Sequence, residues 1–187
     1  MARIEDLAER YGKHIGTPWQ RTISGAQRVI MVVYEKEMER TLRARKLAFE
    51  TATREAGHDW YEIDITDTFP EWMAGDDYRD EYFASPDDLQ LKLEAEFAEH
   101  VAERIRDVLT RPEVTETSAV ALFGAGALFG FVRLSQVLKL IERDIKGRLV
   151  VFFPGHKDGS NYRLFDARDG WNYLAVPITM NGVGGLE

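Results

Sequence analysis

The first candidate for chemistry is a glycine-rich turn, Gly124-Ala125-Gly126, which follows a run of apolar residues at 119–123. Glycines between a strand and a helix let backbone N–H groups approach a phosphate. Here Gly130 makes the spacing G-x-G-x-x-x-G, one residue longer than the dinucleotide fingerprint. No acidic residue follows the next strand to bind a ribose. A tight turn with close helix packing is therefore the preferred interpretation, and nucleotide or phosphate binding by Gly124 and Gly126 is kept as the alternative.

A second apolar run, residues 29–34, lacks the P-loop that would hold a triphosphate. It is followed by Glu35-Lys36-Glu37-Met38-Glu39, without the Gly-Lys-Ser/Thr step, and three carboxylates there would repel phosphates. The four histidines (His14, His58, His100 and His156) have no metal-ligand spacing. His156 is retained as a candidate for ligand binding because it follows a strand that we expect near the centre of the sheet.

Carboxylates give the third candidate, a Mg²⁺ site. Asp64 and Asp67 stand where one strand ends, and Asp158, Asp166 and Asp169 stand in a later polar segment. Helix capping and turn formation explain these residues without a metal, so we favour structural roles. The chain has no cysteine, and its serines lack the G-x-S-x-G setting of a nucleophile. The sequence predicts no catalytic residues, no metal and no cofactor.

Two stretches are candidates for contact with a partner. Arg40, Arg43, Arg45 and Lys46 form a basic band, in which Glu39 stands four residues before Arg43 and can pair with it. A solvated face is the default for such a band, with an acidic partner or a nucleic acid as the alternative. The other stretch is an acidic segment with four aromatic residues, of which we expect about half to enter the core and the rest to suit docking: Trp72, Tyr78, Tyr82 and Phe83.

Composition limits the classes of protein further. The 187 residues include 44% hydrophobic and 30% charged residues, which is typical of a globular domain. The net charge of −8 argues against general binding to nucleic acids or anionic membranes. No apolar run approaches the ~20 residues of a bilayer-spanning helix, and the first residues do not resemble a signal peptide. We expect a cytoplasmic protein that binds neither membranes nor, directly, nucleic acids.

Strands alternate with helices along the chain, which predicts parallel pairing. Four apolar runs and one alternating run predict strands, the alternating one nearer a sheet edge: 29–34, 119–123, 149–153, 173–178 and, alternating, 60–65. Pro154-Gly155 should stop its strand, leaving 155–172 as an ordered loop. Helical spacing predicts helices at the N-terminus, 35–56, 85–111 and 128–145, with two short helical turns in 68–83.

These elements predict the fold class. We expect a single α/β domain over residues 1–180, with three layers and a mostly parallel central sheet of about 4–5 strands flanked by helices. Such a domain is Rossmann-like or P-loop-like in architecture, without a P-loop. Residues 181–187 should form a flexible C-terminal tail.

Four segments carry a resemblance to a known family. They are SGAQRVIMVVY (24–34), AFETATREAGHDWYEIDITDTF (48–69), LFGAGALFGFVRLSQVLKLIERDIKGRLVVFFPG (122–155) and NYRLFDARDGWNYLAVPI (161–178). Read together, they resemble the BrxB family of BREX bacteriophage-defence systems, and the resemblance extends from Ile4 to Pro177. The last segment is the most specific, because its composition is not demanded by any generic fold.

The resemblance implies a non-catalytic subunit that helps a BREX system to methylate host DNA and exclude phage. It implies association with the phosphatase-like PglZ, and contact with BrxC, PglX or BrxA as further alternatives. The family carries no established catalytic motif, so no active site is transferred to this chain. A degenerate nucleotide- or phosphate-binding domain of the same system, using Gly124, Gly126 and His156, is the rival hypothesis.

Overall fold

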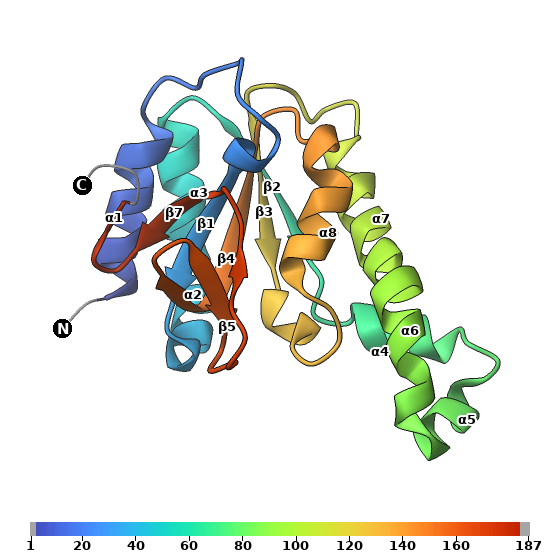
Figure 1. Ribbon diagram of the computed structural model, residues 1–187. Helices are drawn as coiled ribbons and strands as arrows, with labels where there is room; N and C mark the ends of the chain where they lie inside the picture. The colour runs from blue at the N-terminus through green and yellow to red at the C-terminus, as the bar shows by residue number, and fades with distance from the viewer. Residues whose placement is uncertain (1–2, 184–187) are drawn as a thin grey trace.

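The computed structural model describes residues 3–183, which form a mostly parallel sheet between two layers of helices (Figure 1). The sheet order is β2-β3-β4-β1-β7-β8, and the first five of these strands run parallel. Their bounds are β1 Val29–Tyr34, β2 Asp59–Asp64, β3 Ser118–Phe123, β4 Arg148–Asp158 and β7 Val176–Thr179. The predicted α/β class with about 4–5 parallel strands is confirmed.

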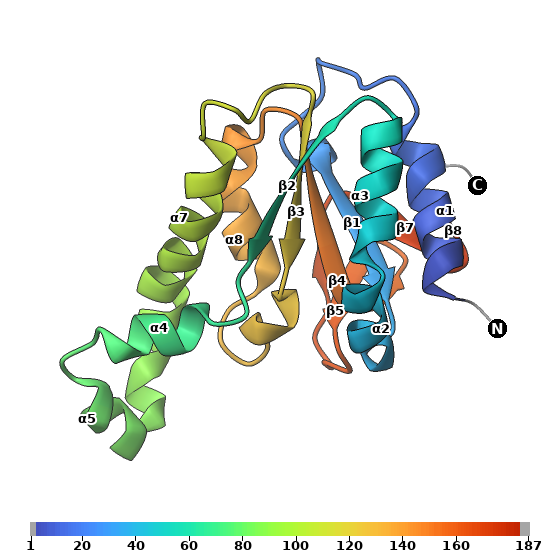
Figure 2. The ribbon, with the colours of Figure 1, turned by 180° about the vertical axis from the view of Figure 1, so that it is seen from behind.

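The strands at the centre are apolar because both of their faces are covered. Every residue of β1 and β3 is buried, whereas β2 has only two buried residues, Trp60 and Ile63, and lies at the edge of the sheet, as predicted. The helices α1 (Ile4–Ile15) and α3 (Lys46–Glu55) cover one face, and the helices α7 (Ala98–Leu109) and α8 (Leu134–Ile141) cover the other (Figures 1 and 2). The Tyr11 hydroxyl and the Thr53 Oγ1 atom lie 2.6 Å apart and join α1 to α3.

The prediction that Pro154-Gly155 ends its strand is wrong. β4 continues to Asp158 and then forms a hairpin with β5 (Asn161–Leu164), which pairs in turn with β6 (Trp171–Asn172). Proline is tolerated because β4 leaves the sheet at this point: its pairing with β3 ends at Val151 and its pairing with β1 ends at Pro154. The expected loop 155–172 is therefore in large part an antiparallel extension.

Two predicted helices also differ from the structure. The helix expected over 35–56 is divided into a 3₁₀ turn, Lys36–Met38, the helix α2, Glu39–Ala44, and α3, because the Arg45 backbone leaves the helical region at φ −107° and ψ 9°. The helix expected over 128–145 shrinks to α8, because Gly130 adopts φ +80°, which no right-handed helix accommodates. A 3₁₀ turn, Ala125–Leu128, precedes that glycine.

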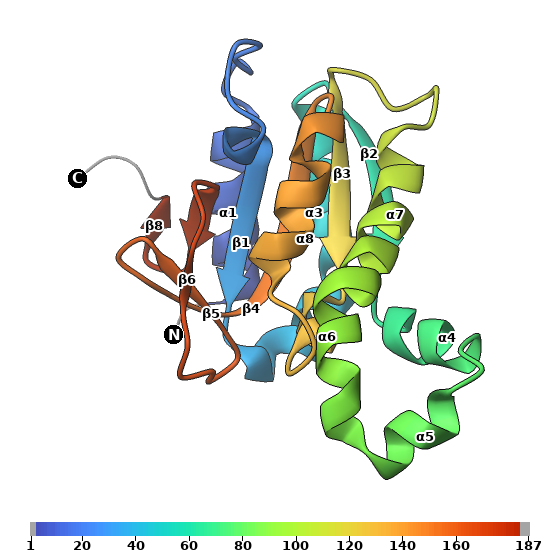
Figure 3. The same ribbon diagram turned by 45° about the vertical axis from the view of Figure 1, so that its right-hand side comes forward.

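The segment between β2 and α7 projects past the sheet, and we call residues 68–97 the arm (Figures 1 and 3). The two short helices expected in 68–83 are present as α4 (Thr68–Ala74) and α5 (Arg79–Ala84). A 3₁₀ turn, Pro86–Leu89, leads into α6 (Gln90–Lys92) and a π-helical turn, Leu93–Phe97, which continues as α7. The arm is thus a helical extension at one end of the domain.

The C-terminal end of the described chain is partly paired. β8 (Gly182–Val183) pairs antiparallel with β7, so the predicted tail 181–187 begins with residues that belong to the sheet. Residues 184–187 lie outside the described residues. The assignment of 1–180 to one domain stays a prediction.

Phe152 lies in the layer between the sheet and α3, where its ring stacks on Phe123 at 4.6 Å and meets Phe49 edge-on at 4.9 Å. We expect Phe152→Ala to lower the free energy of unfolding by about 3–5 kcal/mol, because it removes a fully buried ring and leaves a cavity. Urea unfolding followed by circular dichroism measures the change. The control, Phe83→Ala, removes a ring that is 64% exposed and should cost less than about 0.5 kcal/mol. Equal losses in the two variants would contradict this account of the core.

Candidate functional site

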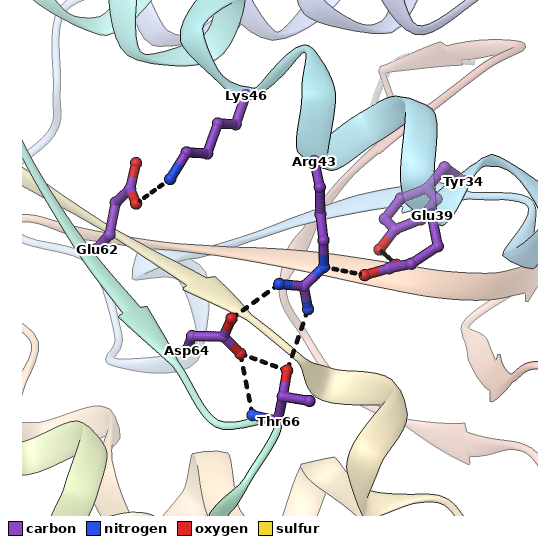
Figure 4. Close-up of polar contacts among 7 residues, drawn as sticks. All are labelled: Tyr34, Glu39, Arg43, Lys46, Glu62, Asp64 and Thr66. Carbon is purple, nitrogen blue, oxygen red and sulfur yellow. Dashed lines mark hydrogen bonds and ion pairs between the residues drawn. The ribbon is translucent and has the colours of Figure 1, made fainter.

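The carboxyl-terminal edge of the parallel strands is where α/β proteins usually bind ligands, and here it carries a group of interacting polar side chains (Figure 4). Tyr34 ends β1 and Asp64 ends β2, while Glu39 and Arg43 come from α2, which lies beside both strand ends. Thr66 follows Asp64 in the turn after β2. We call these five residues the Arg43 cluster.

Arg43 is the centre of this cluster. Its Nε donates to Glu39 Oε1 at 2.6 Å, its Nη1 to Asp64 Oδ2 at 2.8 Å and its Nη2 to Thr66 Oγ1 at 3.1 Å. The second oxygen of Asp64 accepts the backbone N–H of Thr66 at 3.0 Å, and the Tyr34 hydroxyl donates to Glu39. Each acidic partner is therefore already bound within the chain.

The electrostatics of the Arg43 cluster keep its charges fixed. Burial raises the pKa of Asp64, but hydrogen bonds from Thr66 and Arg43 outweigh burial and hold that pKa below its usual range. Burial also lowers the pKa of Arg43, and its bonds to Asp64 and Glu39 outweigh burial and raise it. Burial, together with the Glu39 carboxylate, raises the pKa of Tyr34. The cluster has the properties of a structural clamp that fixes α2 to the strand ends, since hydrogen bonds from Thr66 and Arg43 hold the Asp64 carboxylate in its charged form.

Gly124 is explained by this clamp. It adopts φ +87°, and a Cβ atom there would lie 2.6 Å from Asp64 Oδ1 and 2.6 Å from the Thr66 backbone nitrogen. Gly126 is covered instead by the late hairpin, because a Cβ atom there would lie 2.6 Å from the Phe165 ring. The tight turn at Gly124 and the close packing at Gly126 agree with the interpretation preferred from the sequence.

His156 lies on β4, in the part of the strand that pairs with β5, and its side chain is 52% exposed. Its Nε2 atom is 3.7 Å from Asp166 Oδ1, and the ammonium group of Lys36 contacts the other oxygen of the same carboxylate. The bond from Lys36 is the main reason why the pKa of Asp166 is lowered. His156 therefore belongs to an exposed charge group that joins the hairpin to the turn after β1.

The carboxylates considered for Mg²⁺ are not brought together. Asp64 binds Arg43, Asp158 pairs with Arg163, and Asp166 pairs with Lys36. Asp67 precedes α4 but forms no side-chain cap there. Within residues 3–183, no group of three or more His, Asp or Glu side chains is arranged to hold a metal ion.

The basic band is mostly neutralised by carboxylates from other elements. Arg43 binds Asp64 in addition to the predicted partner Glu39. Lys46 Nζ lies 2.7 Å from Glu62 on β2 (Figure 4), and Arg45 lies 3.4 Å from Glu5 on α1. Arg40 is exposed. The partners on β2 and α1 were not identifiable from the sequence, because they are distant along the chain.

The four aromatic residues that the sequence analysis selected at 72–83 divide as expected between core and surface. Trp72 and Tyr82 are partly buried against the core, and the Lys92 ammonium lies 5.9 Å and 5.2 Å from their ring centres. Tyr78 and Phe83 are 63% and 64% exposed. Sequence analysis missed Leu91, which is 82% exposed. The spacing could have indicated this exposure. Leu91 is two positions from both Leu89 and Leu93, and side chains two positions apart on a helix do not share a face, so Leu91 points away from the buried side.

Glycine variants test whether Gly124 is required by the Asp64–Thr66 turn. We expect Gly124→Ala to lower the free energy of unfolding by more than the ~1–2 kcal/mol of left-handed strain alone, because its Cβ would also collide with that turn. The matched control is Gly130→Ala, which has φ +80° and open space around the added carbon, so strain is its only cost. Urea unfolding compares the two. Equal losses would show that the close approach at Gly124 has no energetic weight.

Asp64→Asn tests the clamp through pH. We expect a loss of about 0.5–1.5 kcal/mol of unfolding free energy at pH 7, a modest value because the Asp64 side chain is 49% exposed. Since folding depresses the pKa of Asp64, its stabilisation is present above the ordinary pKa of about 3.9 and is lost as the pH falls below it. The difference between wild type and variant should therefore shrink from pH 7 to pH 3. Asp80→Asn, at a 90% exposed side chain, is the control and should show little change at either pH.

Comparison with known proteins gives the family. A search of curated proteins and a search of solved structures found no match. A family described as BREX protein BrxB matches residues 73–178, which is more than half of the chain. The matched region contains most of the arm, α7, α8, β3, β4, the hairpin and most of β7. The chain belongs to the BrxB family and is a component of a BREX system.

Proposed function

We propose that this chain is a non-catalytic subunit of its BREX system that binds PglZ through the arm and links it to the other components. The observation that carries the proposal is a projecting helical arm with exposed apolar side chains in a member of the BrxB family (Figure 3). Aromatic residues are enriched at protein–protein interfaces, which supports the arm as the surface that binds PglZ.

Exposed apolar residues are concentrated in the arm. Tyr78 directly precedes α5, Phe83 belongs to α5, and Leu91 belongs to α6. Both helices contact the 3₁₀ turn Pro86–Leu89. Single exposed apolar side chains are common on any protein, but three within fourteen consecutive positions, 78–91, on elements that touch one another favour a contact surface. A PglZ surface that covered them would remove mostly apolar area from water.

The root of the arm is packed into the core, which suits a binding element. Phe97 is fully buried and lies edge-on to Phe69 at 5.4 Å, and Phe69 stacks on Phe131 at 4.0 Å. The π-helical turn Leu93–Phe97 lies where the arm joins α7, and such insertions are frequent at functional sites. A pre-organised arm loses little conformational entropy when it binds.

The charged surfaces favour a protein partner over DNA. Three of the four cations in the basic band form ion pairs with carboxylates of the same chain, and the whole protein carries a net charge of −8. Among the helices of residues 3–183, none combines the length and apolarity that a bilayer-spanning helix requires. We propose that the subunit acts in the cytoplasm, as a single α/β domain with the arm attached, and that BrxC, PglX or BrxA contact it elsewhere.

Binding of purified PglZ to variants of the arm tests whether the arm is the interface. The triple variant Tyr78→Ala/Phe83→Ala/Leu91→Ala should weaken PglZ binding at least tenfold, because central apolar anchors provide most of the energy of an interface. Calorimetry or interferometry with purified proteins measures the dissociation constant. The control, Leu47→Ala/Leu174→Ala, removes side chains that are 66% and 72% exposed on other parts of the domain and should bind as wild type.

Two outcomes would contradict the proposal in different ways. If wild-type protein fails to bind PglZ at micromolar concentration, PglZ is not the partner. If the triple variant folds and binds as tightly as wild type, the arm is not the interface, although PglZ remains the partner. Circular dichroism of each variant confirms folding before binding is compared.

A further inference from the structure

A small pocket lies at the amino-terminal edge of the parallel strands, the end opposite to the Arg43 cluster. It has a volume of about 230 Å³ and is lined by residues next to the starts of four strands and after α1, including Trp19, Arg28, His58, Lys146 and Arg148. In Figure 1 this edge is at the top, where the strands begin. We call it the amino-edge pocket. No sequence motif indicates this pocket, because its residues are spread over most of the chain.

Four cations line this pocket, Arg21, Arg28, Lys146 and Arg148, and within residues 3–183 none of them forms an ion pair with an acidic side chain. Arg28 Nη1 donates to the backbone oxygens of Ile145 at 2.8 Å and Lys146 at 3.0 Å. Lys146 Nζ donates to the Val114 backbone oxygen at 2.9 Å, and Arg148 Nη2 donates to that of Gln20 at 3.1 Å. All of these acceptors are neutral carbonyls, which fix the side chains in place without balancing their charge.

Arg148 makes this lack of a counter-charge costly. Arg148 is only 8% exposed, and removing a charge from water is unfavourable unless that charge is paired. Burial, and then the nearby charge of Arg28, lower the pKa of Arg148, whereas the pKa of Arg43 is raised by its carboxylates. Arg148 donates two hydrogen bonds to backbone carbonyls, those of Gly147 and Gln20, whereas a guanidinium has five N–H groups. Donors and net charge therefore remain for an anion.

Aromatic rings hold Arg148 in position. Its guanidinium carbon lies 4.9 Å from the centre of the Trp19 ring, and Trp19 stacks on His58 with ring centres 3.5 Å apart. His58 is fixed in turn by the contact of its Nδ1 atom with the Thr117 backbone oxygen at 3.0 Å. Glu116 also lines the pocket, is exposed, and forms no ion pair with the four cations in the described part of the chain.

We propose that the amino-edge pocket binds a phosphate group, free or carried by a larger ligand, through Arg28, Lys146 and Arg148. Arginine recognises phosphate oxygens with paired N–H donors, and lysine adds a point charge. The volume is below the roughly 300–1,000 Å³ typical of sites for whole drug-sized ligands, so it suits one phosphate group and not an entire nucleotide. This site is separate from the arm and does not depend on the identity of the partner that the arm binds.

Thermal unfolding of the full chain tests the proposal with inorganic phosphate, with AMP, and with potassium chloride at equal ionic strength. We expect a saturable rise in Tm of about 3–5 °C at ten times Kd with phosphate, beyond that with chloride. An equal response to AMP identifies a site that recognises the phosphate group alone, and a larger response identifies a nucleotide as its source. No response to either ligand beyond chloride overturns the proposal.

A designed carboxylate locates the site without removing its structural bonds. Gln20 is exposed and lines the pocket, so Gln20→Glu should place a carboxylate beside the cations, raise the Tm in chloride and abolish the increment due to phosphate. Gln90→Glu makes the same change of side chain and charge on α6 and should keep the full increment. An increment that persists in Gln20→Glu would place phosphate elsewhere and overturn the assignment.

Discussion

Burial of the central strands on both faces is the constraint on which the rest of this structure depends. β1 lies between β4 and β7, and β3 lies between β2 and β4, so each backbone donor and acceptor in these strands can pair only with a neighbouring strand. Apolar side chains then project from both faces and must be covered. Helices provide most of that cover. Beside β4 and β1 the hairpin does so, where Tyr162 and Trp171 pack edge-on against Phe153.

The two edges of the sheet differ in how their cationic side chains are paired. At the carboxyl-terminal edge, the Arg43 cluster pairs its one cation with two carboxylates, and the Phe165 ring lies close against Gly126. At the amino-terminal edge, the side chains of Arg28, Lys146 and Arg148 donate to backbone carbonyl oxygens and not to carboxylates. The carboxyl ends of α1, α3, α7 and α8 lie near this edge (Figure 2), and their exposed carbonyls favour positive charge. At the edge that usually binds ligands in this fold, Arg43 and Lys46 are therefore paired with carboxylates of the same chain, while at the opposite edge Arg28, Lys146 and Arg148 form no such ion pair within the described residues.

The arm is the main departure from a plain three-layer domain. A helix that only covered the sheet could begin near Ala98, but here helical structure starts at Pro86 and extends past the strand ends. The extension is anchored by Leu93 and Phe97 and by the Lys92–Asp76 ion pair. It exposes apolar side chains in a chain whose net charge otherwise keeps the surface polar, which is the property expected of a subunit that works in an assembly.

The fold class and the edge position of β2 could be predicted from the sequence alone, as could the entry into the core of about half of the aromatic residues at 72–83. These features depend on the local period of apolar residues, which reports how many faces of an element are buried. It did not reveal that β4 continues through Pro154, since a proline is tolerated only where neighbouring strands stop pairing, and that depends on register. Nor did it show which carboxylate meets Arg45 or Lys46, or that Arg28 and Arg148 line one pocket 120 positions apart in sequence. Those contacts exist only once the crossovers bring distant segments to a common edge, so the tertiary structure alone decided them.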